Sequence, residues 1–183
     1  ARDAGVRRVV YAASSAAYGN DASEQQVETA TPKPLSPYGV SKLTGEYYCQ
    51  SFAQVYKLET VCLRYFNVFG SRQDPTSQYA AVIPLFITGM IDGNAPKIYG
   101  DGLQSRDFCF VANVVHGNLL AANAPQANGQ VINIATGKRT NLLELVAGIN
   151  AHLGTRLDAI HLEARTGDVK HSRADISKAQ NLL

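Results

Sequence analysis

The sequence is poor in cysteine, methionine and tryptophan, with three, one and none of them in 183 residues. Cys49, Cys62 and Cys109 are odd in number, lie far apart and show no Cys-x-x-Cys spacing, so they predict neither a disulfide framework nor a zinc site. The four histidines have no metal-ligand spacing either. We therefore predict no metal site and interpret the cysteines as reduced thiols in the core of a cytoplasmic protein.

Long runs of charge and of apolar residues are also missing. The formal net charge is only +2, and Arg7-Arg8 is typical of the short basic runs, which argues against binding to a phosphate backbone. No apolar stretch reaches the roughly 18 residues that a membrane span needs. No secretory signal is recognisable. Nucleic acid and membrane are therefore not predicted partners.

What is there is the composition of a globular protein, 45% hydrophobic and 17% charged. Strand-like and helix-like stretches alternate, which indicates the α/β class. Strands are expected over 6–13, 60–66, 97–100, 131–135 and 159–164. Helices are expected over 37–54, 80–91, 113–123 and 141–153, with a last one capped by Asp175.

Three side chains stand out around the first long helix. Ser36 is a good N-cap and Pro37 suits the first helical position, so the helix is predicted to begin there. Tyr38 and Lys42 are four residues apart and share one face of it, where the ammonium can act on the phenol. Ser14 ends the strand over 6–13, and ligands of parallel sheets bind outside the carboxyl ends of strands.

These residues belong to a longer pattern. A serine followed 24 residues later by Tyr-x-x-x-Lys resembles the extended short-chain dehydrogenase/reductases, and among them the NAD-dependent nucleotide-sugar epimerases. The resemblance continues along nearly the whole chain through Leu63-Arg64-Tyr65-Phe66-Asn67-Val68-Phe69-Gly70, Gly100-Asp101-Gly102, Ser105-Arg106-Asp107-Phe108, Arg165-Thr166-Gly167-Asp168 and Ala174-Asp175-Ile176-Ser177-Lys178-Ala179. It is most like bacterial epimerases that prefer acetylated sugars.

The resemblance implies a partial Rossmann-like parallel sheet, which binds NAD, over 1–70 and 108–140. A small α/β domain for the nucleotide sugar would take 71–107 and 141–183. Complete members of the family begin with a strand and a glycine-rich turn that holds the dinucleotide pyrophosphate. No GxGxxG or GxxGxxG occurs here, so we expect a fragment that starts in mid-domain. Uncovered sheet edges would favour a homo-oligomer, most simply a dimer.

The implied chemistry is C4 epimerisation of a UDP-sugar through a 4-keto intermediate. Ser14, Tyr38 and Lys42 would be catalytic: Ser14 orients the sugar oxygen, and Tyr38 acts first as base and then as acid. A free phenol has a pKa near 10 and must give up its proton near neutral pH. One cation about 4 Å away, at an effective dielectric of 20, supplies about the 4 kcal/mol required.

Other matches imply contacts with cofactor and substrate. Phe66 and Val68 would join Tyr38 and Lys42 at the cofactor. The implied substrate contacts are Ser14, Ser15, Asn67, Ala81, Val82, Arg106, Arg165, Asp168 and Ser172. Guanidinium makes paired hydrogen bonds with phosphate oxygens, which suits the two arginines to a diphosphate. The alternatives are a salt bridge between Arg106 and Asp107 and a plain surface charge at Arg165.

Ser172 stands where the family has a gate that faces C2 of the sugar. A small residue there leaves room for an N-acetyl group, which favours UDP-GlcNAc and UDP-GalNAc as substrates. Related dehydratases and decarboxylases carry an acidic residue between Ser14 and Tyr18, and none stands here. Three alternatives stay open: a UDP-glucose 4-epimerase or other nucleotide-sugar dehydratase or reductase, a noncatalytic UDP-sugar-binding module, and a structural fragment.

Overall fold

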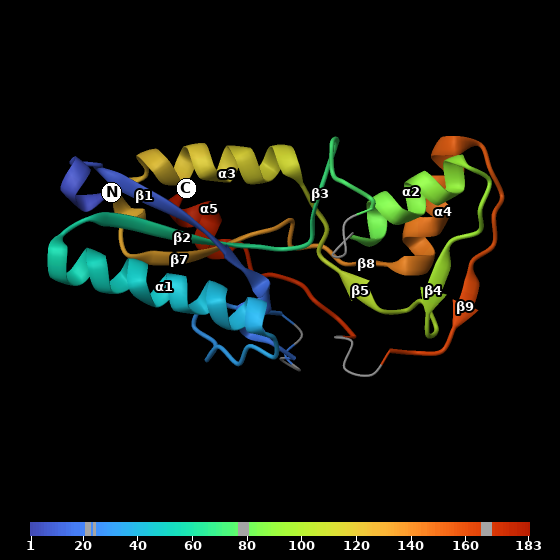
Figure 1. Cartoon of the computed structure of the whole chain (residues 1–183), viewed down its shortest axis with the longest axis horizontal. Coiled ribbons are helices and arrows are strands. Elements are labelled where there is room, and N and C mark those ends of the chain that lie inside the picture. Colours follow the sequence, from blue (N-terminus) through green and yellow to red (C-terminus); the bar gives the residue numbers. More distant parts are fainter. Residues whose placement is uncertain (21–22, 24, 77–80, 166–169) are drawn as a thin grey trace.

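The fold is a three-layered α/β arrangement joined to a smaller group of helices and strands, and it confirms the predicted α/β class (Figure 1). It is described here from a computed structural model for residues 1–20, 23, 25–76, 81–165 and 170–183. A parallel sheet has the order β1 (Arg8–Ser14), β2 (Glu59–Tyr65), β7 (Gln130–Ile134). Helix α1 (Pro37–Tyr56) covers one face of this sheet and α3 (Val111–Asn123) covers the other.

The central strand β2 explains why both faces are covered. Successive side chains of a strand point to opposite faces. Val61 and Leu63 pack with Val114 of α3, and Cys62 packs with Cys49 of α1. Both sets of β2 side chains are buried, so this strand could not face water on either side.

Helix α1 begins where the sequence predicts. The Ser36 hydroxyl accepts the backbone N–H of Gly39 at 3.1 Å, and Pro37 is the first helical residue. Gly39 also permits a close approach, because a Cβ there would lie 2.8 Å from the carbonyl oxygen of Ala16. The start of α1 is thereby pressed against η2 (Ser15–Tyr18), the turn that follows β1.

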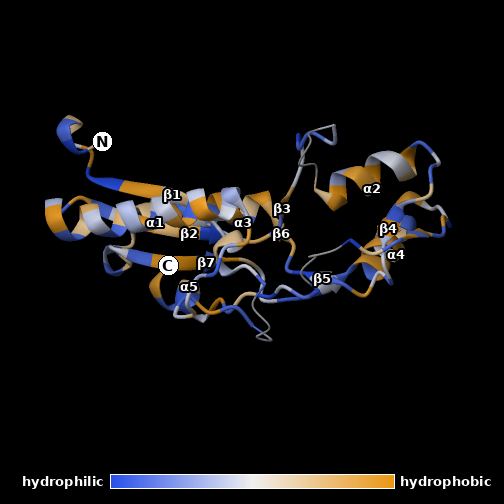
Figure 2. Cartoon of the chain, turned by 60° about the horizontal axis from the view of Figure 1, so that its bottom comes forward, coloured by the Kyte–Doolittle hydropathy of each residue, from blue (hydrophilic) through white to orange (hydrophobic). Residues whose placement is uncertain are grey.

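The smaller group consists of α2 (Val82–Ile91), α4 (Leu142–Leu153) and the parallel pair β4 (Lys97–Tyr99) and β9 (Ile160–Leu162). Its core is apolar and includes Phe86, Met90, Ile98, Val146 and Ile149. Much of helix α2 is orange, the colour of hydrophobic residues, in Figure 2. Asn141 and Glu144 form a capping box at the start of α4, which fixes where that helix begins.

Short strands connect the two parts. β3 (Val68–Phe69) pairs in parallel with β6 (Cys109–Phe110), and β5 (Ser105–Arg106) pairs antiparallel with β8 (Thr140–Asn141). The last helix, α5 (Ser177–Leu182), packs against β7 rather than against α4. Single-turn helices η1 (Arg2–Ala4) and η3 (Pro125–Ala127) complete the fold. The domain boundaries expected from the sequence stay a prediction.

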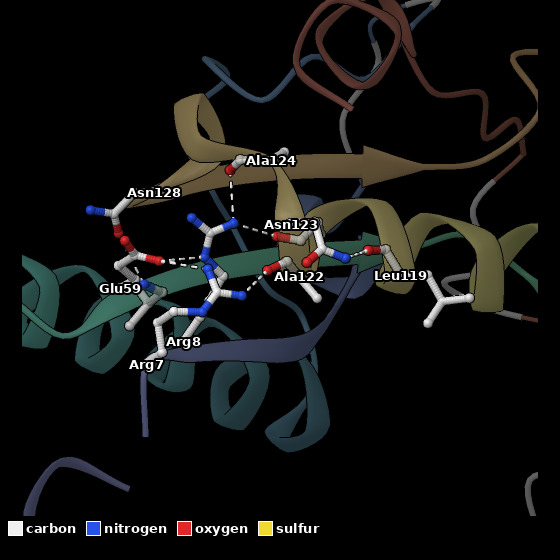
Figure 3. A network of polar contacts seen from close by, with 10 residues as sticks. Arg7, Arg8, Glu59, Leu119, Ala122, Asn123, Ala124 and Asn128 are labelled. Carbon is white, nitrogen blue, oxygen red and sulfur yellow. Dashed lines mark hydrogen bonds and ion pairs between the residues drawn. The ribbon is translucent and has the colours of Figure 1, made fainter. Parts of the chain in front are cut away.

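An arginine holds the end of the sheet where strands β1 and β2 begin (Figure 3). Arg8 pairs with Glu59 at 2.8 Å and donates to the carbonyl oxygens of Ala121 and Ala124 at 2.7 Å each. Ala121 lies in the last turn of α3 and Ala124 is the C-cap residue of that helix, where a cation is favourable. This polar cluster therefore anchors α3 on β1.

Among the described helices, none has the length and apolar character needed to cross a bilayer.

Candidate active site

The site lies at the carboxyl ends of β1 and β2, where Ser14 stands opposite Tyr65 in the parallel register. The Ser14 hydroxyl oxygen accepts the backbone N–H of Ala16 at 3.2 Å and so caps η2. Just beyond β2, Asn67 has a φ of 31°, a left-handed conformation that asparagine tolerates better than most residues. Its amide donates to the Asp107 carbonyl oxygen at 3.3 Å.

Tyr38 and Lys42 come from the first two turns of α1. The Lys42 ammonium donates to the carbonyl oxygen of Ala12 on β1 at 3.0 Å and lies 5.7 Å from the centre of the Tyr38 ring. It also lies 5.6 Å from the centre of the Tyr11 ring. The strand thus holds the ammonium close to the phenol ring, which is 56% exposed.

One cavity of about 480 Å³ brings most of the predicted residues together. Its walls come from the ends of β1 and β2, from η2, the loop after it and α1, and from β3, β5 and the segment after β9. The residues that line it are Ser14, Ser15, Ala16, Gly19, Gln26, Tyr38, Tyr65, Asn67, Val68, Arg106 and Ser172. Seven of these were expected from the sequence, and Ser172 lies 158 residues from Ser14 along the chain.

A second cavity of about 230 Å³ shares Arg106 with the first. Val82 of α2 and Arg165 also line it, together with Tyr99 of β4. The Arg165 guanidinium lies 3.7 Å from the centre of the Tyr99 ring, a close cation–π contact. Because both cavities include Arg106, they are neighbours. Arg106 and Arg165 were both expected from the sequence to bind the substrate.

Some predicted residues are not on the cavity walls. Phe66 is fully buried in the core with Tyr18 and Ala174, so its ring does not reach the cavity, whereas its neighbour Tyr65 does. Adjacent residues at the end of a strand point to opposite sides, which explains the exchange. Ala81 is the N-cap residue of α2. Asp168 lies outside the described residues.

Asp107 has a different role from the salt bridge considered for it. Its fully buried carboxylate accepts the N–H and hydroxyl of Thr136, at 2.9 and 2.7 Å, and the N–H of Gly137 at 2.9 Å. It also accepts the N–H of Ala174 at 3.3 Å. One carboxylate therefore joins the end of β7 to the segments that carry Arg106 and Ser172.

A buried ion pair stands behind η2 and was not predicted. Arg64 of β2 donates to both carboxylate oxygens of Glu46 on α1, at 2.9 and 2.7 Å. Burial disfavours the charge, but the pairing with Glu46 prevails and holds the pKa of Arg64 above its ordinary value. The guanidinium also lies 4.5 Å from the centre of the Tyr18 ring. The only sequence signal was an arginine inside an apolar strand.

The Tyr18 hydroxyl continues this network by donating to the side-chain oxygen of Asn133 at 2.7 Å. Burial raises the pKa of Tyr18 and, at the cavity, the pKa of Tyr65. Both phenols are therefore neutral hydrogen-bonding groups near pH 7. Within the described part of the chain, no three His, Cys, Asp or Glu side chains gather in a way that would hold a metal ion.

This arrangement matches known proteins. The pattern of the NAD dependent epimerase/dehydratase family covers residues 1–135. The chain belongs to this family. A putative UDP-glucose 4-epimerase of Methanocaldococcus jannaschii is 40% identical over 178 residues, which are 97% of this chain and 57% of the relative. The chain thus spans little more than half the length of that relative.

Solved structures of family members superpose closely. The UDP-N-acetylglucosamine 4-epimerase from Methanobrevibacter ruminantium, in complex with UDP-N-acetylmuramic acid, has a TM-score of 0.94 and 43% identity over 98% of this chain and 57% of its own. The UDP-glucuronic acid 4-epimerase of Bacillus cereus, with UDP-glucuronic acid and NAD, has a TM-score of 0.86 and 33% identity over 96% of this chain and 55% of its own. The sheet therefore has the Rossmann-like fold of nucleotide-sugar epimerases.

Proposed function

We propose that the protein interconverts UDP-GlcNAc and UDP-GalNAc at C4 through a 4-keto sugar, with NAD as cofactor. The observation that carries this proposal is the single cavity lined by Ser14, Tyr38, Arg106 and Ser172. It combines a hydroxyl and a phenol for proton handling, a guanidinium for phosphate and a small side chain beside the sugar.

Tyr38 is the acid and base of the proposed reaction. Its phenol oxygen takes the proton of the C4 hydroxyl and later returns one to the same oxygen. The Ser14 oxygen accepts the N–H of Ala16, and this bond does not use the hydroxyl hydrogen. Ser14 can therefore donate that hydrogen to the sugar oxygen. The Lys42 ammonium, held by the Ala12 carbonyl, supplies a fixed positive charge near the phenol ring.

The residues present fit one end of an NAD molecule. Tyr38 lines the cavity, and Lys42, which does not line it, places its ammonium 5.7 Å from the centre of the Tyr38 ring. A phenol and an ammonium can both bind ribose hydroxyls. Val68 adds an apolar side chain to the same wall. Bound NAD would supply the reversible redox chemistry at C4. The sequence contains no glycine-rich turn for its pyrophosphate.

Two neighbouring cavities suit the two halves of a nucleotide sugar. Arg106 lines both, which is where a diphosphate between a sugar and a nucleoside would lie. Arg165 and Val82 in the second cavity would hold the nucleoside side, with Ala81 beside them and Asp168 at the ribose. Ser172, 8% exposed on the wall of the first cavity, leaves room for a C2 acetamido group. A homodimer stays part of the proposal.

The test is to incubate the full-length protein with UDP-GlcNAc and with UDP-glucose and to follow the sugar protons by NMR. We expect UDP-GalNAc to form from UDP-GlcNAc, and Ser172→Tyr to lose this conversion more than any conversion of UDP-glucose. Ser177→Tyr, a serine outside both cavities, is the matched control. Conversion of UDP-glucose alone would overturn the proposed substrate, and conversion of no UDP-sugar would overturn the function.

A further inference from the structure

Gln26 is an unexpected polar residue on the wall of the first cavity. Only 3% of its surface is exposed, and it lines the cavity together with Tyr38 and Ser172. Its side-chain carbonyl oxygen is buried without a hydrogen-bond partner in the part of the chain that the structure describes. Leaving such an acceptor unpaired is unfavourable. A group that is not part of the chain can supply the missing donor.

The backbone of Gln26 is held firmly in place. Its N–H donates to the carbonyl oxygen of Arg173 at 2.8 Å, and its carbonyl oxygen accepts the N–H of Asp175 at 2.9 Å. Gln26 is thereby bridged in parallel to Ala174. Ser172 lies two residues before that bridge, so Gln26 and Ser172 occupy adjoining strips of the same cavity wall.

The buried network described above supports this position. The Asn133 side chain donates to the main-chain carbonyl oxygen of Gln26 at 3.0 Å and to the main-chain carbonyl oxygen of Asp175 at 3.1 Å. Asn133 in turn accepts the Tyr18 hydroxyl, and Tyr18 lies against Arg64. The wall is therefore fixed before any ligand arrives, while the terminal torsion of a glutamine is soft enough to turn its amide toward one.

We propose that the side-chain carbonyl oxygen of Gln26 accepts a hydrogen bond from the C2 substituent of the bound hexose, the N–H of its acetamido group. This inference rests on the proposed function. On the same wall Arg106 offers only donors, whereas the Gln26 side-chain oxygen is a buried acceptor with no partner among the described residues. Gln26 is then a specificity-determining residue that recognises the group for which Ser172 leaves space.

The experiment measures Kd by titration calorimetry of the full-length protein with UDP-GlcNAc and with UDP-2-deoxyglucose, which has no donor at C2. Both ligands are titrated into the wild type and into Gln26→Met, which keeps the side-chain length but lacks the acceptor. We expect the ratio of the two Kd values to shrink by about 5- to 10-fold in Gln26→Met, the size of one hydrogen bond. Comparing ratios cancels any loss of affinity that both ligands share.

Two further variants separate recognition from loosening of the wall. Gln25→Met is the matched control, because the Gln25 amide donates to the Ala174 carbonyl oxygen at 3.1 Å and does not line the cavity. Gln26→Glu keeps an acceptor, so we expect Gln25→Met and Gln26→Glu to keep the wild-type ratio. Gln26→Leu, which also lacks the acceptor, replaces Gln26→Met if that variant does not fold. An unchanged ratio in Gln26→Met, or an equal change in Gln25→Met or Gln26→Glu, would overturn the assignment of Gln26 alone. Failure of the wild type to bind either UDP-sugar would instead overturn the proposed function.

Discussion

The sheet region and the region of α2, α4, β4 and β9 border the same site but are held together by different forces. In the sheet region, buried polar groups pair with one another: Glu46 with Arg64, Tyr18 with Asn133, and Asp107 with backbone N–H groups. In the other region, the buried cluster consists of apolar side chains such as Phe86 and Ile98. Hydrogen bonds are directional, whereas apolar packing mainly demands volume.

This difference follows what each region must position. In the proposed reaction Ser14, Tyr38 and Gln26 face the sugar, and Asn133 of the buried polar network donates to the main-chain carbonyl oxygen of Gln26 at 3.0 Å. The cavity near Arg165, which the proposal gives to the nucleoside, has apolar side chains of α2 and Leu142 of α4 on one part of its wall and the two arginines on another. Four experiments can break or sharpen the comparison, and they are ordered by expected effect.

The largest effect is expected for Glu46→Gln. The substitution leaves the Arg64 charge buried without its partner, because both residues are at most 2% exposed. We expect the free energy of unfolding to fall by about 3–5 kcal/mol. Urea denaturation followed by circular dichroism measures it. Asp3→Asn, in the exposed pair of Arg2 and Asp3, is the control and should cost less than about 1 kcal/mol. Equal losses would contradict the claim that the buried pair holds the sheet region together.

In the apolar region, Ile98→Ala should lower the free energy of unfolding by about 2–5 kcal/mol, since Ile98 is fully buried and the change leaves a cavity. Ile98→Leu conserves the volume and should cost less than about 1.5 kcal/mol. The same urea titrations distinguish the two. If Ile98→Leu were as damaging as Ile98→Ala, this core would depend on exact shape and not on volume.

Arg106→Lys tests the junction of the two cavities. Lysine keeps the charge but cannot make the paired hydrogen bonds of a guanidinium, so we expect binding of UDP to weaken by about 10-fold, or ~1.4 kcal/mol. Calorimetric titration with UDP measures this loss. Arg156→Lys, at an exposed arginine that lines neither cavity, should leave the affinity unchanged. Equal affinities of Arg106→Lys and wild type would remove Arg106 from the diphosphate site.

The smallest perturbation is a thiol reagent at pH 8. Burial raises the pKa of Cys49 and Cys62 and raises that of Cys109 to about 11, which lowers the thiolate fraction of each at this pH. We expect almost no reaction in the folded protein and reaction of all three thiols in guanidinium. Absorbance of the released chromophore counts them. Rapid reaction of Cys62 or Cys109 in the folded protein would show that the sheet region opens readily.

Local patterns predicted a good part of this molecule. Ser36 and Pro37 located the start of α1, and the four-residue spacing put Tyr38 and Lys42 on one helix. The predicted strands and α1, α3 and α4 occur within a few residues of their expected ranges. The α2 helix starts at Val82, and residues 77–80 before it lie outside the described part of the chain. These features depend on neighbours in sequence, which a single sequence shows directly.

The parts that could not be predicted depend on distant contacts. Glu46 and Arg64 are 18 residues apart on a helix and a strand, and only the packing of α1 on β2 makes them a buried pair. Gln26 reaches the cavity because its segment pairs with Ala174. The sequence pattern did not show that Tyr65 faces the cavity and Phe66 the core. Neighbouring residues of an extended chain point to opposite sides, so an error of one residue reverses the assignment.

The central claim is that Tyr38 moves the proton of a bound UDP-sugar in the cavity it shares with Ser14. The most direct measurement compares Tyr38→Phe with wild type in the full-length protein, using calorimetry for the Kd of UDP-GlcNAc and NMR for its turnover. The account predicts an almost unchanged Kd and a turnover reduced by about 100- to 10,000-fold. Turnover within about twofold of wild type in Tyr38→Phe would contradict it.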